Sequence, residues 1–339
     1  MAALLPKVGM RQPKLRLSRA AIAAFLGLGV LLHLLPFYYI VSTSLKPGAE
    51  VVSTPPTFIP SAITLDAWKL VLQIGDNAEI VQLVQEPFWV YFVNSAFITL
   101  LAVGLGLPVT ALAAYANSKL QSGRSARLSF LFFIGTMMVP FVVTLVPMYL
   151  LTLNFPFTLP DAPTIPGTDS EFPTLRLWDT PWAVILPAIF VPFNFLLFKG
   201  FFDTIPDSVI NAARVDGGSE LNIFRRIVMP MAVPVFAVTA YMSFGSVWDN
   251  FLWQLVTLQS PDKVTMSVAT YQLIDRLSTK GTTGGGAAAQ AEGMSDLLNS
   301  GLTWNGMMVL AILQSIPIFI AFLVCREYLL RGIKIRGLK

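Results

Sequence analysis

The sequence predicts an all-α integral membrane protein with six transmembrane helices and a polar cytoplasmic loop between the fourth and fifth. Of its 339 residues, 55% are hydrophobic and only 12% are charged, and the mean hydropathy is +0.67. About a quarter of the residues of a soluble domain are normally charged. Six apolar runs are each long enough to cross a bilayer, and one polar segment over residues 203–230 interrupts the second half. These observations place the chain in a membrane.

The six spans follow from length and composition, because an α-helix needs about 20 mostly apolar residues to cross the hydrocarbon core. Such runs lie near Ala20–Tyr39, Trp89–Ala114, Leu128–Leu151, Trp182–Phe198, Met231–Leu255 and Met307–Val324. The first is too long for a cleaved signal sequence and lacks a small-residue cleavage site, so we expect it to be retained. The expected organisation is a basic cytoplasmic tail over residues 1–19, a transmembrane domain over 20–325 and a cytoplasmic C-terminal tail over 326–339.

Basic residues predict the orientation of these spans. They gather in the N-terminal tail, the second connection and the C-terminus: Lys7, Arg11, Lys14, Arg16, Arg19, Lys119, Arg124, Arg127, Arg326, Arg331, Lys334, Arg336 and Lys339. The first and third connections are instead mainly acidic: Glu50, Asp66, Asp76, Glu79, Glu86, Asp161, Asp169, Glu171 and Asp179. By the positive-inside rule, both termini and the even-numbered connections are expected in the cytoplasm.

Prolines interrupt the third and fourth spans at Pro140, Pro147, Pro187 and Pro192. Proline frees a backbone carbonyl and bends a helix, which a membrane bundle tolerates where neighbouring helices or a cavity satisfy the freed group. Broken helices therefore point mildly to a translocation path. Asn194 follows the last of these prolines and is a candidate substrate-facing residue.

Four other polar or aromatic residues are candidates for the pathway: Asn94, Trp248, Asp249 and Asn250. For Asn94, a hydrogen bond to another helix is the simpler use. Asp249 is the acidic residue within the fifth predicted span, and a charge inside a span is a functional hypothesis by default. Two interpretations stay open, since Asp249 could line the pathway or anchor the outer interface beside aromatic residues.

The polar segment Thr204–Pro230 predicts a pair of short helices outside the membrane. Eight charges fall between Lys199 and Arg226, which is incompatible with hydrocarbon. Pro206 and Asp207 suit the start of a helix, and Gly217 and Gly218 would stop it. Ser219 can then cap a second helix that returns to the membrane. This shape suits docking to another protein, although a helix lying on the lipid surface is the alternative.

The same segment carries two short patterns separated by a spacer: Asn211-Ala212-Ala213 with Asp216-Gly217-Gly218, then Ile227 with Met229-Pro230. It resembles the signature cytoplasmic loop of permease subunits in binding-protein-dependent ABC importers, whose pattern is Glu-Ala-Ala, two residues, Asp-Gly-Ala, a spacer and Ile-x-Leu-Pro. This chain departs from it by Asn211 for Glu, Gly218 for Ala and Met229 for Leu. The change at Asn211 puts in doubt any salt bridge that the family's Glu would make.

The resemblance extends over roughly Phe92 to Leu338 and is strongest with the smaller permease of maltose-type systems. It implies a bacterial inner-membrane subunit that forms a heterodimer with a second homologous permease. Partners would include two ABC ATPase subunits, which would carry ATP and Mg, an extracytoplasmic sugar-binding protein and membrane lipid. The implied ATPase contact is made by Asn211, Ala212, Ala213, Asp216, Gly217, Gly218, Ser219 and Pro230.

Other functions are less well supported by the sequence. The glycine-rich stretch GTTGGGAAAQAEG is not followed by Lys and Ser or Thr, so it predicts a flexible outer linker and no phosphate loop. One Cys and one His cannot form a zinc site, and no catalytic residue, cofactor or nucleic-acid partner is expected of this chain. An ion-gradient-driven secondary transporter, the main alternative, would usually carry paired ionisable groups near the midplane.

Overall fold

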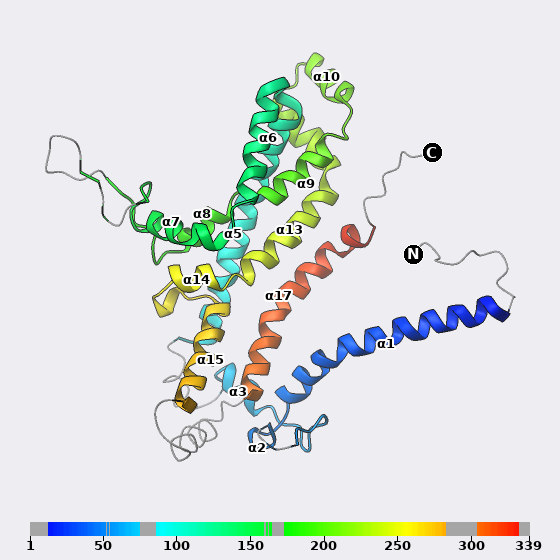
Figure 1. The fold of residues 1–339 in the computed structure, drawn as a ribbon, viewed down its shortest axis with the longest axis vertical. Coiled ribbons are helices and arrows are strands. Elements are labelled where there is room, and N and C mark those ends of the chain that lie inside the picture. The colour runs from blue at the N-terminus through cyan, green and yellow to red at the C-terminus, as the bar shows by residue number, and fades with distance from the viewer. Residues whose placement is uncertain are drawn as a thin grey trace. The chain divides into compact units, whose positions relative to one another are not determined.

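The computed structural model describes residues 13–51, 53, 55–74, 86–158, 161, 163–164, 173–282 and 304–331, and its regular elements are helices (Figure 1). The described residues also contain two isolated β-bridges, which pair Asn154 with Phe157 and Phe155 with Leu175. The chain divides into one unit of residues 1–80 with 277–313 and a second of residues 81–276 with 314–339.

The first unit contains a long apolar helix and a compact turn that follows it. Helix α1, Pro13–Ser44, begins before the predicted span and ends five residues beyond it, with Pro36 inside the helix. Helices α2, Gly48–Val51, and α3, Asp66–Val71, follow. The buried Lys46 ammonium donates to the Thr57 carbonyl, and the Glu50 carboxylate accepts the Thr57 hydroxyl at 2.6 Å and the Ser61 amide at 3.0 Å. Asp66 lies in the first turn of α3, where its charge complements the positive end of the helix dipole.

The second unit is a helical bundle centred on α5, Phe88–Tyr115, which continues as the π-helix η1, Ala116–Leu120. The next span is broken into α6, Gly123–Met137, and α7, Phe141–Leu153, which meet at 98°. Helices α8, Pro181–Ala188, and α9, Pro192–Phe202, then pack on α5. Gly106 permits the crossing, because a Cβ there would lie 2.9 Å from the Ile189 carbonyl oxygen.

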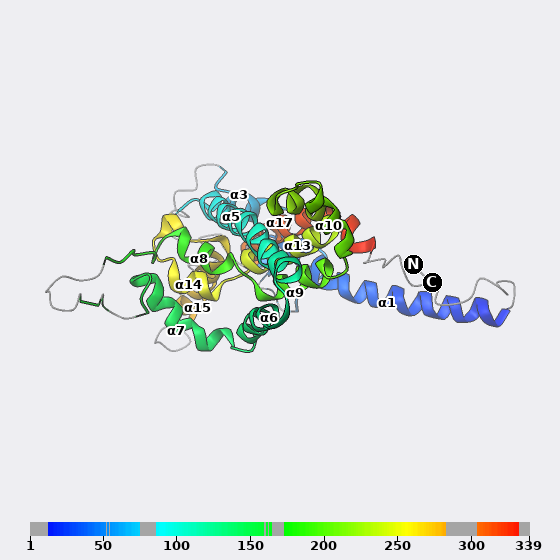
Figure 2. The same ribbon diagram turned by 90° about the horizontal axis from the view of Figure 1, so that it is seen from above.

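The polar segment and the fifth span complete this bundle. The polar segment forms two short helices, α10, Asp207–Val215, and α11, Glu220–Ile223. The π-helix η2, Phe224–Val228, and α12, Met229–Met231, continue α11. The chain then bends by 81° between Met231 and the start of α13, Val233–Trp248. Figure 1 shows α10 at the end of the bundle, and Figure 2 shows α6 and α10 on opposite sides of α9.

The chain beyond α13 departs from the predicted span. We expected one helix from Met231 to Leu255, whereas α13 ends at Trp248 and a short helix, α14, Leu252–Thr257, follows. A 3₁₀ turn, η3, Pro261–Lys263, precedes α15, Met266–Thr282, which hydropathy did not predict. Helix α17, Trp304–Arg331, contains the sixth predicted span. Most of the predicted glycine-rich linker, and residues 1–12 and 332–339 of the two tails, lie outside the described residues.

Four helices of the described chain are long and apolar enough to cross a membrane: residues 18–44, 88–120, 181–202 and 304–329. The two bent pairs pass the same test if each is one span, which gives six. A helical class with several apolar spans is therefore confirmed for the described residues, and four to six of these spans are long enough to cross a membrane.

Candidate functional site

The polar segment folds as a helical hairpin whose turn is made by two glycines. Helix α10 begins after Pro206 with Asp207 in its first turn and ends at Val215. Gly217 follows in the left-handed region at φ +81°. A Cβ on Gly218 would lie 2.8 Å from the Ala213 carbonyl oxygen, so the turn closes against the end of α10. Ser219 occupies the N-cap position of α11 but makes no side-chain capping hydrogen bond.

One face of this hairpin is buried and the other is open. Ile210 and Ile223 insert into the bundle core among aromatic side chains such as Phe202 and Phe224. The residues predicted for ATPase contact lie mostly on the open face: Asn211, Ala212, Asp216, Gly217, Ser219 and Pro230 are exposed, and Ala213 and Gly218 are half-buried. Sequence reasoning missed Val215 and Leu221, which are 88% and 57% exposed beside them. The sequence feature that could have identified Val215 and Leu221 is that both are apolar residues within a charged segment.

An ion pair joins the two helices of the hairpin and ties them to the end of α5. The Arg214 guanidinium donates to the Glu220 carboxylate at 2.6 Å and to the Asn211 amide oxygen at 3.0 Å. The Tyr115 hydroxyl donates to the other Glu220 oxygen at 2.8 Å. The hydrogen bond and charge of Arg214 hold the pKa of Glu220 below its usual range. Asn211 thus takes part in a network whose acid is Glu220.

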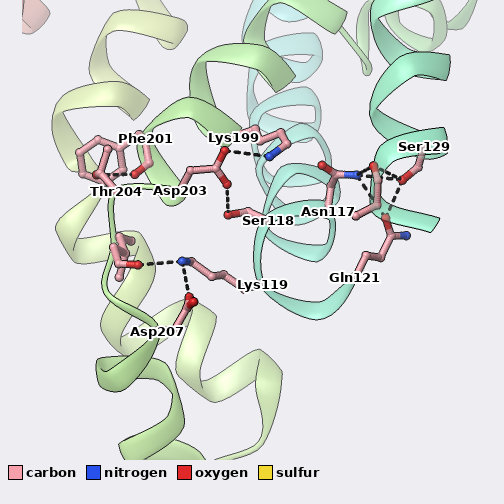
Figure 3. A network of polar contacts seen from close by, with 12 residues as sticks. Asn117, Ser118, Lys119, Gln121, Ser129, Lys199, Phe201, Asp203, Thr204 and Asp207 are labelled. Atoms are coloured by element: carbon pink, nitrogen blue, oxygen red, sulfur yellow. Dashed lines mark hydrogen bonds and ion pairs between the residues drawn. The ribbon is translucent and has the colours of Figure 1, made fainter. Parts of the chain in front are cut away.

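A second set of contacts fixes the start of the hairpin (Figure 3). The Lys119 ammonium, on η1, donates to the Asp207 carboxylate and to the Ile205 carbonyl, both at 2.7 Å. This contact lowers the pKa of Asp207. Beside it, Asp203 accepts from the Ser118 hydroxyl at 2.6 Å and from Lys199 at 2.8 Å. Both ends of α10 are therefore attached to the same end of α5.

A cavity of about 470 Å³ lies deeper in the second unit, between α5, α8, α9, α13 and α14. Asn194 and Asn250, two of the candidate pathway residues, line it. The buried Asn194 amide donates to the Ser243 hydroxyl at 2.6 Å, and the Asn250 amide oxygen accepts the Trp253 backbone N–H at 3.4 Å. Its other walls are mainly apolar, and they include Trp253, Phe141 and Met148.

The other three candidates lie elsewhere. Asn94 donates to the carbonyls of Asp262 and Val264 at 2.8 and 3.0 Å, which lie in η3 and directly after it. Trp248 is buried and donates its indole N–H to the Gln314 carbonyl at 3.0 Å. Asp249 is exposed and accepts from the Gln314 amide at 3.4 Å. The bundle therefore brings together two of the five predicted pathway residues.

Titratable and sulfur side chains are too dispersed in the described ranges to suggest a metal centre. No group of three or more His, Cys, Asp or Glu residues gathers there. The hairpin and the cavity can bind other molecules through hydrogen bonds and through surfaces of matching shape.

A sequence profile of one protein family, described as binding-protein-dependent transport system inner membrane component, matches residues 106–335, about two thirds of the chain. The chain belongs to this family. The match begins within α5 and contains the hairpin, the cavity residues of α8, α9, α13 and α14, and the whole of α17.

Named members of this inner membrane component family align over most of the chain. The arabinooligosaccharide transport permease AraQ of Halalkalibacterium halodurans is 26% identical over 90% of each chain. AraQ of Bacillus subtilis is 26% identical over 96% of this chain and 98% of its own. The galactooligosaccharide transport permease GanQ of Bacillus subtilis is 25% identical over 90% and 89%.

The fold of this family member is also similar to a solved structure. A chain of a bacterial ABC transporter involved in importing the acidic polysaccharide alginate superposes with a TM-score of 0.68. The match covers 94% of this chain and 98% of that one, with 22% sequence identity. The two chains therefore share a fold over nearly their whole lengths.

Proposed function

We propose that this chain is a membrane subunit of an ATP-driven ABC importer and forms half of the pathway for a sugar or oligosaccharide. Family membership supports the transport role, and the printed names of the relatives support the substrate class. An extracytoplasmic binding protein would deliver the sugar. A second homologous permease would supply the other half of the pathway.

The hairpin α10–α11 is the proposed contact with the ATPase. The observation that carries this assignment is its combination of an open face with small side chains and a buried face attached to the bundle. Ala212 and Gly217 would let a partner approach closely, while the exposed Val215 and Leu221 would bury apolar surface in the contact. An interfacial lipid helix would need a broader apolar face than this one offers.

Movement of the docked hairpin would reach the bundle through α5. Glu220, Arg214 and Tyr115 connect its second helix to α5, and Lys119 connects its start to η1. ATP-driven closure of two ATPase subunits would therefore displace α10, α11 and α5 together. The bundle would rock between an inward-open and an outward-open state, and nucleotide binding would shift the equilibrium between these two states.

The cavity containing Asn194 and Asn250 is the proposed surface of the translocation pathway. Amides donate to and accept from hydroxyl groups, and the ring of Phe141, which lines the cavity and is 42% exposed, offers a flat apolar face for a sugar ring. ATP and Mg are assigned to the ATPase partners, because the chain carries no Gly-rich loop followed by Lys and Ser or Thr.

Cysteine cross-linking tests the docking assignment directly. In a Cys325→Ser background, Ala212→Cys should cross-link to a cysteine in the ATPase of the assembled complex. Ile74→Cys, on the first outer connection, is the matched control, since it is 60% exposed and predicted to face the opposite side. Capture of the ATPase from Ile74→Cys, or none from Ala212→Cys in an active complex, would refute the assignment.

A further inference from the structure

A recess of about 500 Å³ lies where α6 begins and α9 ends. It shares no lining residue with the cavity that contains Asn194. The positive-inside rule assigns this end of α6 to the cytoplasm, because Lys119, Arg124 and Arg127 surround it. The recess is therefore expected at the depth of the inner-leaflet headgroups.

The recess has one uncompensated positive charge. Lys199 and Asp203, both on its wall, form an ion pair at 2.8 Å, and the Lys199 ammonium also lies 5.3 Å from the centre of the Phe130 ring. Arg127 lines the same wall, is exposed and forms no hydrogen bond or ion pair with the part of the chain that the structure describes. Its five N–H donors are thus available to an anion.

The wall that carries Arg127 is held in place by buried hydrogen bonds (Figure 3). Asn117 is 4% exposed, and its amide donates to the Gln121 side chain at 3.2 Å, the Ala126 carbonyl at 2.9 Å and the Ser129 hydroxyl at 2.8 Å. These contacts clamp the first two turns of α6 against η1. Arg127 lies within those turns, so the fold fixes where its backbone stands on the wall of the recess.

Exposed apolar surface on α6 begins beside Arg127. No residue of α6 is buried, and Leu131, one turn beyond Arg127 on the same side of the helix, is 52% exposed. Leu128 and Phe132, which lie further round the helix and away from the recess, are 56% and 68% exposed. A ligand that fills the recess and covers this strip must carry an anionic group at one end and hydrocarbon at the other.

We propose that this recess binds the phosphodiester headgroup of an anionic phospholipid, with the acyl chains lying along α6. Arg127 donates to the phosphate, and the Lys199–Asp203 pair hydrogen-bonds the polar end of the headgroup. The single charge of a phosphodiester matches the one uncompensated cation. A soluble phosphomonoester carries about 1.5 to 2 negative charges and has nothing to cover α6.

Photo-labelling of the assembled complex in phosphatidylcholine nanodiscs tests this site. The probe is phosphatidylglycerol with a photoreactive acyl chain, and labelled α6 peptides are measured as the probe fraction rises. Arg127→Gln should raise the probe fraction for half-maximal labelling about fivefold, the loss of roughly one cation–headgroup contact. Arg124→Gln removes the same charge from the same helix but from outside the recess, so it should raise the half-maximal probe fraction clearly less than Arg127→Gln does.

Two results would overturn the proposal. Equal losses in Arg127→Gln and Arg124→Gln would mean that α6 attracts lipid only through diffuse surface charge. Displacement of the probe by soluble glycerol 3-phosphate would mean that the recess selects a free phosphate ester. Because Arg127 is exposed and unbonded, Arg127→Gln should unfold at the wild-type temperature, which the same preparations can verify.

Discussion

Gly217 sets the geometry of the proposed ATPase contact. Its φ of +81° costs a residue with a Cβ about 1–2 kcal/mol, although a Cβ there would meet no atom of this chain within 4 Å. We expect Gly217→Leu to insert into membranes normally but to transport poorly, because it strains the turn and holds the partner away. Uptake by reconstituted vesicles measures this effect. Gly217→Asn is the matched control, since Asn tolerates the left-handed region. Normal uptake by Gly217→Leu would refute the docking assignment.

Glu220 is the residue at which the hairpin joins α5. Its ion pair with Arg214 is partly exposed, at 41% and 36%, and by itself contributes less than about 1 kcal/mol. Glu220→Ala also leaves the hydroxyl of the buried Tyr115 without its acceptor, so we expect a stability loss of about 1–3 kcal/mol. More ATP should also be hydrolysed per sugar transported, because Arg214 and Tyr115 would both lose their link. Glu220→Gln keeps an acceptor for Tyr115 and should be intermediate. Unchanged stoichiometry in Glu220→Ala would exclude this transmission route.

The break between α13 and α14 places Asn250 on the cavity, whereas Asn94 on α5 serves packing. Alanine substitutions should therefore separate the two amides. Asn250→Ala is expected to raise the KM for sugar uptake with little change in thermal unfolding. Asn94→Ala should lower the unfolding temperature, since it leaves two carbonyls without their donor, and should keep the KM of the complex that assembles. A raised KM in Asn94→Ala, with an unchanged KM in Asn250→Ala, would indicate that the pathway does not pass through this cavity.

Asp179 holds the chain that follows α14. Its carboxylate accepts the backbone N–H groups of Gln259 and Ser260 at 2.9 Å, the Ser260 hydroxyl, and the Lys263 ammonium at 3.1 Å. Burial works to raise the pKa of Asp179, but these hydrogen bonds outweigh it and hold the pKa well below its usual range. The stabilisation is therefore complete above the ordinary Asp pKa of about 3.9 and declines as pH falls through the lowered value.

We expect Asp179→Asn to lower the unfolding temperature of the purified complex, because it weakens hydrogen bonds to a charged acceptor worth about 1.5–3 kcal/mol. The difference from wild type should be constant between about pH 8 and 5 and should narrow in stronger acid. Asp161→Asn is the control, since Asp161 is exposed and has no partner in the described chain. A difference that grows in acid would contradict the assigned ionisation.

The sequence predicted the helices well where one local signal decides them. Helix α5 matches its predicted span to within one residue at each end, because its apolar run is continuous. Pro206 and Gly217 predicted the limits of α10, since both act on their own backbone. The angle of 98° between α6 and α7 could not be predicted, because hydropathy depends on composition alone and says nothing about the direction in which a helix continues.

Contacts between distant residues were beyond the reach of sequence patterns. Tyr115 and Glu220 are 105 positions apart, and Asp179 lies about 80 positions from its partners. The same limit explains the pathway residues: Asn94 and Asn250 carry the same amide, and only packing directs one to a carbonyl pair and the other to a cavity. A polar residue in a predicted span is thus a candidate pathway residue, but the sequence alone does not show whether it faces the pathway or packs against another helix.

The central claim is that the whole molecule is a transport subunit driven by a separate ATPase. The direct measurement compares ATP hydrolysis and sugar uptake by proteoliposomes that contain this chain alone with those of the complex that also contains the second permease, the ATPase and the binding protein. We predict that the chain alone neither binds nor hydrolyses ATP, and that uptake and hydrolysis appear together when the partners are added. Hydrolysis by the purified single chain, or uptake by the complex driven by an ion gradient without ATP, would contradict the account.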